Sequence, residues 1–182
     1  MSSNEVESDS NNQGPLVRFY LGLSPDSSGR FLSEIRAWDH DRLERTHDYI
    51  QWLFPTRQPS QFNLSAPILD DRQISEFQNS EPLQAELTAS LRQMLGFYGL
   101  ALAEAGSKPT VQRSADWTSR TQTWLTPGNH NFLRITRILT SLRLLGLAPL
   151  AAAMLTALEH CHEEHGHVIG ERTMAFWRAA GR

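Results

Sequence analysis

The sequence predicts an all-α protein, a compact multi-helix bundle of about seven to eight helices with an extended N-terminal arm. The first observation behind this prediction is that apolar residues recur at spacings of three and four along several long segments. The second is that cap- and turn-forming residues separate those segments. The third is that no stretch of alternating apolar residues has a second stretch to pair with. The length of 182 residues suits one domain with a substantial core, which we place at residues 15–182.

Charge and cysteine content narrow the class of protein. With 17 Lys+Arg against 20 Asp+Glu, the net charge of −3 argues against a surface for nucleic acid or anionic membranes. The single cysteine, Cys161, excludes an internal disulfide and fits a reducing compartment, so we expect a cytoplasmic protein. The most apolar run, Leu144–Leu158, is interrupted by Pro149 and is shorter than the ~18 residues of a spanning helix. We therefore expect a soluble chain without a transmembrane segment.

The N-terminal elements are predicted to be a tail, an arm and a short helix. Met1–Gly14 is polar and acidic, which predicts a disordered tail rather than a secretory signal. Leu16–Gly22 alternates aromatic and aliphatic residues but has no strand partner, so we expect it to lie extended across the helices. Ser27 or Ser28 then caps a short helix that runs to Trp38.

The central element of the prediction is a helix over Leu43–Pro55, LERTHDYIQWLFP, capped by Asp39 or Asp41. One face of this helix holds the mostly apolar set Leu43, His47, Ile50 and Phe54. The opposite face holds Asp48, Tyr49 and Trp52. A surface helix does not normally carry large aromatic residues on its outer side. The helix is therefore either packed on all sides or presents a recognition surface.

A loop and two helices follow the central helix. Thr56–Leu69 contains two prolines among polar residues, which predicts a long irregular loop. Asp70 or Asp71 caps a short helix to about Gln78, and Ser80 caps a long one. The apolar stripe of the long helix consists of Leu83, Leu87, Leu91, Met94/Leu95, Tyr98 and Leu102.

Four more helices are predicted in the C-terminal part, bounded by Pro, Gly and Asn residues. They cover Gln112–Leu125, Asn129–Leu145, Pro149–His165 and Glu171–Ala180, with Gly166 ending the third of them. The apolar centres of the three longest patterns are predicted to be buried in one cluster. These residues are Ile50, Phe54, Leu91, Leu95, Ile135, Ile138 and Leu142.

Three segments carry a resemblance to a known family. They are HDYIQWLFP at His47–Pro55, LGFYGL at Leu95–Leu100 and NHNFLRITRILTSLRLLGL at Asn129–Leu147. In this order they resemble the conserved N-terminal domain of the opioid growth factor receptor family. The resemblance implies a non-catalytic, receptor-like helical domain that binds a short aromatic peptide of the methionine-enkephalin type. It is also the only basis for a nuclear or membrane association, and the family's long repeat-bearing tail has no counterpart in this sequence.

The first candidate site is formed by Asp48, Tyr49 and Trp52. A carboxylate beside two aromatic rings offers an ion pair for the terminal ammonium of a peptide and a surface for its aromatic side chain. The alternative is that Trp52 packs against Leu16–Leu21 or a neighbouring helix, with its indole N–H bonded to a backbone carbonyl.

The second candidate site lies at the start and along one side of the helix that follows Asn129. It consists of His130, Asn131, Arg134 and Arg137, on a stripe with Ser141 that we expect to lie opposite the core. A helix N-terminus and two guanidinium groups could bind an anion or a carboxylate. The alternative is an ordinary capped helix whose arginines pair with neighbouring acidic residues.

The sequence gives less support to metal binding, to catalysis and to cofactor binding. The run EHCHEEHGH, which includes His160–His167, contains metal-ligand types but lacks the spacing of a known zinc motif, so a solvated helix end is the alternative. Cys161 has no base fixed by a third group near it in sequence, and we expect it at an exposed, mobile terminus. No nucleophile elbow, phosphate loop or dinucleotide fingerprint is present, so we expect neither an enzyme nor a cofactor. The competing function is an adaptor that docks a partner protein on the same aromatic surfaces.

Overall fold

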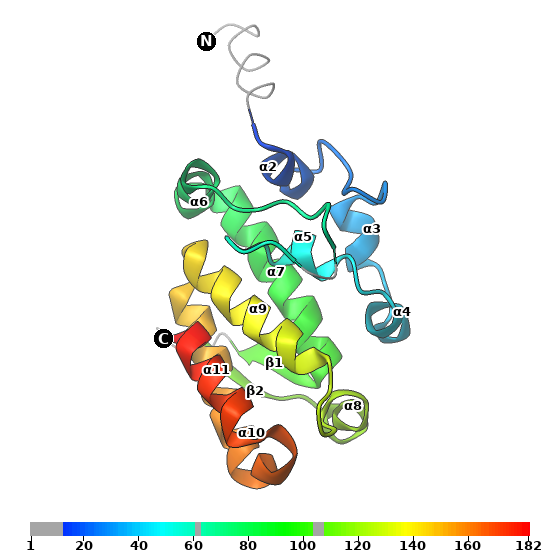
Figure 1. Ribbon diagram of the computed structural model, residues 1–182, viewed down its shortest axis with the longest axis vertical. Coiled ribbons are helices and arrows are strands. Elements are labelled where there is room, and N and C mark those ends of the chain that lie inside the picture. The colour runs from blue at the N-terminus through cyan, green and yellow to red at the C-terminus, as the bar shows by residue number, and fades with distance from the viewer. Residues whose placement is uncertain (1–12, 61–62, 104–107) are drawn as a thin grey trace, which may run out of the picture. The chain divides into compact units, whose positions relative to one another are not determined.

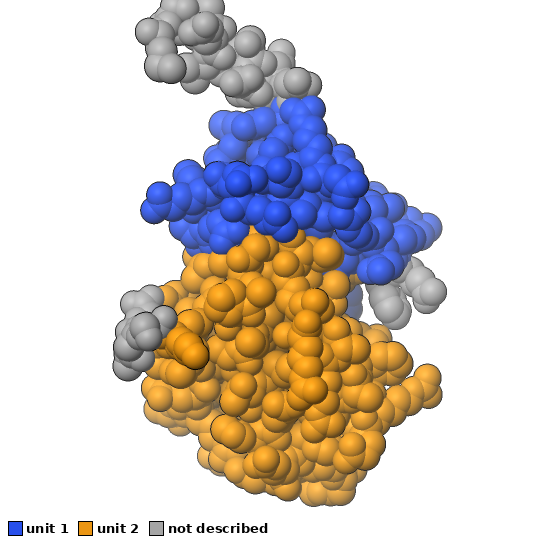
Figure 2. Space-filling view, turned by 90° about the vertical axis from the view of Figure 1, so that its left-hand side faces the viewer, with its two compact units in different colours: residues 1–87 blue, residues 88–182 orange. Residues whose placement is uncertain are grey.

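The computed structural model describes residues 13–60, 63–103 and 108–182 (Figure 1). Within these residues it contains ten helices and one two-stranded sheet, so the prediction of a mostly helical protein is confirmed. The predicted tail, Met1–Gly14, lies largely outside the described residues. The chain divides into two compact units, Met1–Leu87 and Thr88–Arg182 (Figure 2). We call them the first and the second unit and describe each by itself.

The first unit is built mostly from short helices. Its helices are α2 (Pro15–Tyr20), α3 (Leu32–Arg36), α4 (His40–Arg45), α5 (Ile50–Leu53), α6 (Asp71–Gln78) and the beginning of α7 (Glu81–Tyr98). Helix α6 begins at a capping box in which the Asp70 carboxylate accepts the amide of Gln73 at 2.7 Å, as its predicted cap requires. The cap predicted for α7 is also present, since Ser80 Oγ accepts the amide of Leu83 at 3.5 Å.

The expected extended arm is wrong, because the chain forms helix α2 there and this helix packs against α6. Pro15 occupies the first turn, where its fixed φ favours a helix. The buried side chains have helical spacing: Leu16, Val17, Phe19 and Tyr20. The Tyr20 hydroxyl donates to the Leu53 carbonyl. The ring centroids of Tyr20 and Phe77 lie 4.9 Å apart. A six-residue segment is too short for its sequence pattern to distinguish a helix from a strand.

The predicted helix through Leu43–Pro55 is interrupted, because α4 ends at Arg45 and α5 begins only at Ile50. Thr46 has extended backbone angles, φ −97° and ψ 132°. The interruption turns Tyr49 back toward α4, so that its hydroxyl donates to the Leu43 carbonyl at 3.2 Å. Since all residues from Tyr49 to Phe54 are buried, one straight helix could not direct them all into the core of a small unit. The short helix α3 is likewise shorter at both ends than the predicted segment ending at Trp38.

The second unit combines the end of α7 with a β-hairpin and four helices. These elements are β1 (Leu100–Ala103), β2 (Thr110–Arg113), α8 (Trp117–Trp124), α9 (Asn131–Leu144), α10 (Ala148–Ile169) and α11 (Glu171–Gly181). Helices α9, α10 and α11 pack against one another, and β2 packs on α10 (Figure 1). Trp177 of α11 is fully buried and donates its indole N–H to the Phe132 carbonyl of α9 at 3.1 Å. This contact confirms the predicted placement of the last helix.

Two boundaries in the second unit differ from the prediction. The strands pair antiparallel, with Ala101 opposite Gln112, so a strand replaces the start of the helix expected over Gln112–Leu125. Gly99 makes this possible, because its φ of 77° turns the chain out of α7 into β1. Helix α10 continues past Gly166 and ends at Ile169, and Gly170, whose φ is also 77°, follows it. It is bent at His165, where the backbone leaves the helical region.

The apolar residues predicted to form the core are buried. Ile50 and Phe54 belong to the first unit, and the other five residues belong to the second. The most exposed of the seven is Ile50, at 4%. The single domain over residues 15–182 stays a prediction. No helix in the described part of the chain combines the length and the apolarity needed to cross a bilayer.

Candidate functional site

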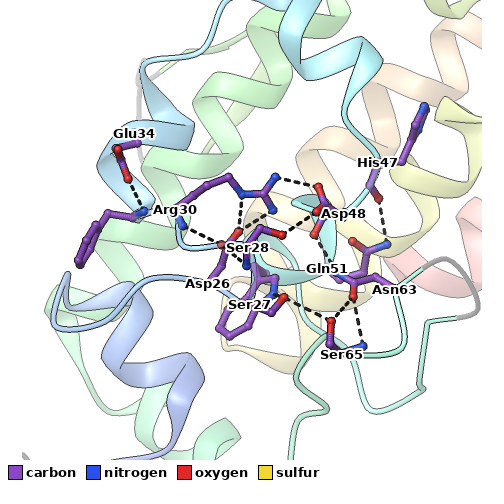
Figure 3. Close-up of polar contacts among 12 residues, drawn as sticks. Asp26, Ser27, Ser28, Arg30, Glu34, His47, Asp48, Gln51, Asn63 and Ser65 are labelled. Atoms are coloured by element: carbon purple, nitrogen blue, oxygen red, sulfur yellow. Dashed lines mark hydrogen bonds and ion pairs between the residues drawn. The ribbon is translucent and has the colours of Figure 1, made fainter.

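A polar cluster in the first unit is centred on Asp48, in the interruption between α4 and α5 (Figure 3). The Asp48 carboxylate accepts hydrogen bonds from Arg30 Nη1 at 2.8 Å and from Ser28 Oγ at 2.9 Å. Its backbone carbonyl accepts a third from Asn63 Nδ2 at 2.9 Å. Asp48 therefore connects three segments without regular structure, the one before α3, its own, and the loop after α5. We call this set with Asp26 the Asp48 cluster.

Asp26 gives the cluster its rigid base. Its carboxylate is fully buried and accepts the amides of Ser28 and Arg30 at 2.9 Å each. The same carboxylate pairs with the Arg30 guanidinium, at 2.6 Å from Nη2. An aspartate that binds amides two and four residues further on holds a tight turn, and Gly29 with a φ of 78° completes it. The turn directs both Ser28 and Arg30 toward Asp48, as Figure 3 shows.

The charges of the cluster are asymmetric, because one guanidinium lies between two carboxylates. Partial burial alone would raise the pKa of Asp48, but the hydrogen bonds from Arg30 and Ser28 outweigh it and hold that pKa below its ordinary value. Burial would lower the pKa of Arg30, and the bonds to Asp26 and Asp48 reverse this effect and raise it. The Asp48 side chain is 42% exposed. An ionised carboxylate is thus fixed in position and open to solvent.

An aromatic ring supports the cluster from one side. The guanidinium carbons of Arg42 and Arg30 lie 4.3 and 5.4 Å from the ring centroid of Trp38. Tyr49 meets the same indole edge-on, with 5.4 Å between centroids. Sequence reasoning did not include Asp26, Ser28, Arg30 or Trp38 in a site. The turn pattern Asp26-Ser-Ser-Gly-Arg30 was a usable signal for part of this arrangement.

The two aromatic residues predicted to line this site are core residues. Tyr49 is fully buried and Trp52 is 5% exposed. Trp52 packs on Phe19 of α2, with 5.2 Å between ring centroids, as the alternative interpretation of Trp52 stated. Its indole N–H donates to Ser27 Oγ at 3.3 Å rather than to a carbonyl. Of the three predicted residues, Asp48 is therefore the one that offers a solvent-exposed group.

The second predicted site belongs to the second unit, and its expected orientation is wrong. Asn131 is fully buried, Arg134 is 5% exposed, and Ser141 on the same stripe is fully buried. Arg134 Nη1 donates to Asn131 Oδ1 at 3.2 Å. Arg137 is half-buried, and burial lowers its pKa. The stripe therefore faces inward, and of the four predicted residues only His130 is exposed.

Asn129 was the predicted cap of α9, but the helix begins at Asn131 and His130 occupies the cap position; Asn129 precedes it and bonds to the first helical residue. Asn129 Oδ1 accepts the amide and the side-chain N–H of Asn131, both at 3.0 Å. Its own Nδ2 donates to the Thr123 carbonyl at 3.1 Å and to Thr126 Oγ1 at 2.9 Å. The amides of Phe132 and Leu133 bond to the carbonyls of Asn129 and His130 at 3.0 and 3.1 Å, so the first turn of the helix is satisfied internally. The motif NHN therefore has a structural role in the described chain.

At the histidine-rich end of α10, acidic side chains contact arginine or histidine and do not converge as metal ligands would. Glu164 pairs with Arg113 of β2 at 2.7 Å, and His162 Nε2 lies 3.5 Å from Glu171 Oε1. Among residues 13–60, 63–103 and 108–182, no group of three or more His, Cys, Asp or Glu side chains could hold a metal ion. Cys161 is 2% exposed rather than at a mobile surface, and burial raises the pKa of its thiol to about 11. It is therefore protonated at neutral pH and unsuited to nucleophilic attack.

Several known proteins resemble this chain in sequence. A family model described as "Opioid growth factor receptor (OGFr) conserved region" matches residues 10–177. The Homo sapiens protein named opioid growth factor receptor is 40% identical over 156 residues, 82% of this chain and 22% of that protein. Mus musculus opioid growth factor receptor-like protein 1 is 34% identical over 148 residues, 79% of this chain and 31% of that protein. The Xenopus tropicalis protein of the same name is 37% identical over 134 residues, 71% of this chain and 25% of that protein.

The chain thus spans less than a third of the length of these relatives. No solved structure gives a significant match to it.

Proposed function

The chain belongs to the family defined by the conserved region of the opioid growth factor receptor, and from this membership we propose that it is a non-catalytic binding domain for a short peptide. The peptide class is one with a free N-terminal ammonium beside an aromatic side chain, as in peptides of the enkephalin type. The observation that carries the proposal is the ionised and partly exposed carboxylate of Asp48, fixed by Arg30 and Ser28. The names of the relatives support the receptor part of the proposal.

The Asp48 carboxylate retains capacity for a cationic ligand. An ionised carboxylate has about four lone-pair sites, and the side chains of Arg30 and Ser28 and the backbone amide of Asp48 each use one of them. An ammonium group can take the remaining site without displacing these donors. Such a charge-assisted bond is worth about twice a neutral one.

Apolar surface lies on the loop that Asn63 ties to Asp48. The neighbouring residue, Leu64, is 90% exposed. An aromatic side chain following the ammonium group would bury it, and burial of apolar surface contributes about 25 cal/mol per Å². Because Tyr49 and Trp52 are buried, this loop replaces them as the apolar part of the proposed site.

The replacement Asp48→Asn tests the proposal, because it keeps the shape of the side chain and removes its charge. We expect peptide affinity to fall by about 1.5–3 kcal/mol, the contribution of a hydrogen bond between charged groups. Calorimetric titration with a tyrosine-initiated pentapeptide measures this change. The matched control is Asp71→Asn, which removes an 88%-exposed carboxylate paired with Arg57 in the same unit and should leave affinity unchanged. Absence of binding to the parent protein, or equal binding to parent and Asp48→Asn, refutes the site.

The free energy of unfolding of Asp48→Asn is a second measurement, and its dependence on pH tests the ion pair of Asp48. Because the folded-state pKa of Asp48 lies below its ordinary value of 3.8, its ion pair stabilises the fold above that value. The stabilisation is lost as the pH falls through the lower, folded-state pKa. The difference in unfolding free energy between parent and Asp48→Asn should therefore be constant near neutral pH and disappear in acid. It should also be small, since surface ion pairs typically contribute about 0–1 kcal/mol.

A second candidate function, docking of a partner protein, is favoured by exposed apolar side chains in the second unit. Leu133 of α9 is 63% exposed and Phe176 of α11 is 54% exposed, on two helices that pack against each other. If this surface binds a partner, the double replacement Leu133→Ser, Phe176→Ser should abolish capture of that partner in a pull-down, and Asp48→Asn should not. If the peptide function holds, the double variant should bind the peptide with parental affinity.

A further inference from the structure

We propose that Ser28 is a phosphorylation site and that a phosphate on it releases the segment around Asp48 from the turn at Asp26–Arg30. The inference goes beyond the proposed peptide binding, and its test requires no peptide. It rests on the position of the Ser28 hydroxyl, which bonds the Asp48 carboxylate at the centre of the cluster in Figure 3.

Ser28 is accessible to a modifying enzyme. It lies between α2 and α3, in a turn without regular structure, and Ser27, Ser28 and Gly29 are all exposed. Its hydroxyl lies at the surface of the turn, and its backbone amide bonds to the Asp26 side chain at 2.9 Å. The turn must open locally for this segment to enter the extended substrate groove of a kinase.

The modification is a phosphoryl transfer from ATP, catalysed by a serine kinase. Ser28 Oγ attacks the γ-phosphorus of ATP, the bond between that phosphorus and the β–γ bridging oxygen breaks, and ADP leaves. The hydroxyl proton passes to a carboxylate of the kinase. The product is a phosphate monoester with a charge of about −1.5 to −2 at neutral pH.

The new phosphate would change the charge balance at Asp48. The hydroxyl proton that Asp48 accepts is lost, and a phosphate takes its place against a carboxylate 2.9 Å from the ester oxygen. Arg30, which contacts Asp26 and Asp48, would then face three anionic groups. Because Asp26 is buried and also holds two backbone amides, it keeps its contact with Arg30. Asp48 is the group that leaves.

Release of Asp48 would extend beyond one side chain. Its carbonyl accepts the bond from Asn63, and its segment sets the start of α5. The amides of Trp52 and Leu53 bond to the carbonyl of the adjacent Tyr49 at 2.9 and 3.1 Å. These two amides therefore report whether the segment has loosened.

The test compares the whole chain carrying phosphoserine at position 28 with the unmodified protein, by amide hydrogen exchange. We expect exchange at Trp52 and Leu53 to accelerate roughly tenfold or more, as for loss of one charge-assisted hydrogen bond. Phosphoserine at position 33 is the matched control, because Ser33 of α3 is exposed and its side chain makes no hydrogen bond to any described residue. Unchanged exchange in the position-28 protein, or an equal rise in the position-33 protein, overturns the proposal.

Two further measurements separate the phosphate from the loss of the hydroxyl and establish that the site is used. Ser28→Ala removes the donor without adding charge, and it should accelerate exchange by clearly less than the phosphate does. If the two effects are equal, the phosphate has no specific role and the proposal fails. Mass-spectrometric mapping of the protein isolated from its own cells with phosphatases inhibited should find phosphate at Ser28. Its absence there overturns the assignment as a site used in the cell.

Discussion

Replacing Phe54 by alanine is expected to lower the free energy of unfolding by about 3–5 kcal/mol, the usual cost of truncating a fully buried aromatic side chain. Phe54 is 0% exposed and follows the last residue of α5, where its amide still bonds to the Ile50 carbonyl at 2.9 Å. The truncation therefore removes apolar contact and leaves a cavity while the backbone bond stays. Urea denaturation followed by tryptophan fluorescence measures the loss.

The control for this prediction is Phe31→Ala, in the same unit. Phe31 is 38% exposed, and its backbone amide, which bonds to Glu34, is unaffected by the replacement. Because part of its ring already faces solvent, Phe31→Ala should cost clearly less than Phe54→Ala. An unchanged denaturation midpoint in Phe54→Ala, or equal losses in both variants, would show that Phe54 is not enclosed as described.

Replacing Gly99 by alanine is expected to destabilise the protein by about 2–5 kcal/mol, although it adds a single methyl group. The φ of Gly99 is +77°, a region that costs a residue with a side chain roughly 1–2 kcal/mol. A Cβ there would also lie 2.8 Å from Trp117 Cα and 3.0 Å from Arg120 Cβ. Because Trp117 Cα belongs to the backbone of α8, relief of this overlap requires a shift of the helix rather than of one side chain.

The replacement Gly128→Ala separates the cost of a positive φ from the cost of steric overlap. The φ of Gly128 is +70°, and a Cβ built on it has nothing within 4 Å. Gly128→Ala should therefore show only the conformational cost, and the difference between the two variants measures the steric overlap. Thermal or urea unfolding gives both values. Equal losses in the two variants would mean that α8 does not approach Gly99 as closely as described.

Long, regular patterns and their caps were predictable from the sequence. Helices α6, α7, α9 and α11 follow from apolar repeats that extend over two or more turns, and Asp70 and Ser80 cap α6 and α7 as predicted. The burial of the seven core residues follows from the same patterns. In these segments the local preference for a helix agrees with the tertiary packing, so the apolar pattern alone predicts the helix.

The errors lie where long-range contacts overrule the local pattern. Helix α2 is stabilised by packing on α6 and by the bond from Tyr20 to Leu53, 33 positions further along the chain. The interruption at residues 46–49 depends on Tyr49 reaching Leu43 and on Asp48 meeting Ser28 and Arg30. The β-hairpin depends on the pairing of β1 with β2, in which Ala101 lies opposite Gln112. None of these partners is adjacent in sequence, so periodicity could not reveal them.

The candidate site shows the same division. The sequence by itself determined that Asp48 is a carboxylate among aromatic residues, within a segment that identifies the family. Only the tertiary structure decided that Tyr49 and Trp52 turn into the core, that Arg134 and Asn131 are buried, and that Asp48 meets the turn formed by Asp26. The physical reason is that residue type and spacing define which groups a helix could present. Burial depends instead on which other segments pack against it, and in this protein those segments are distant in sequence.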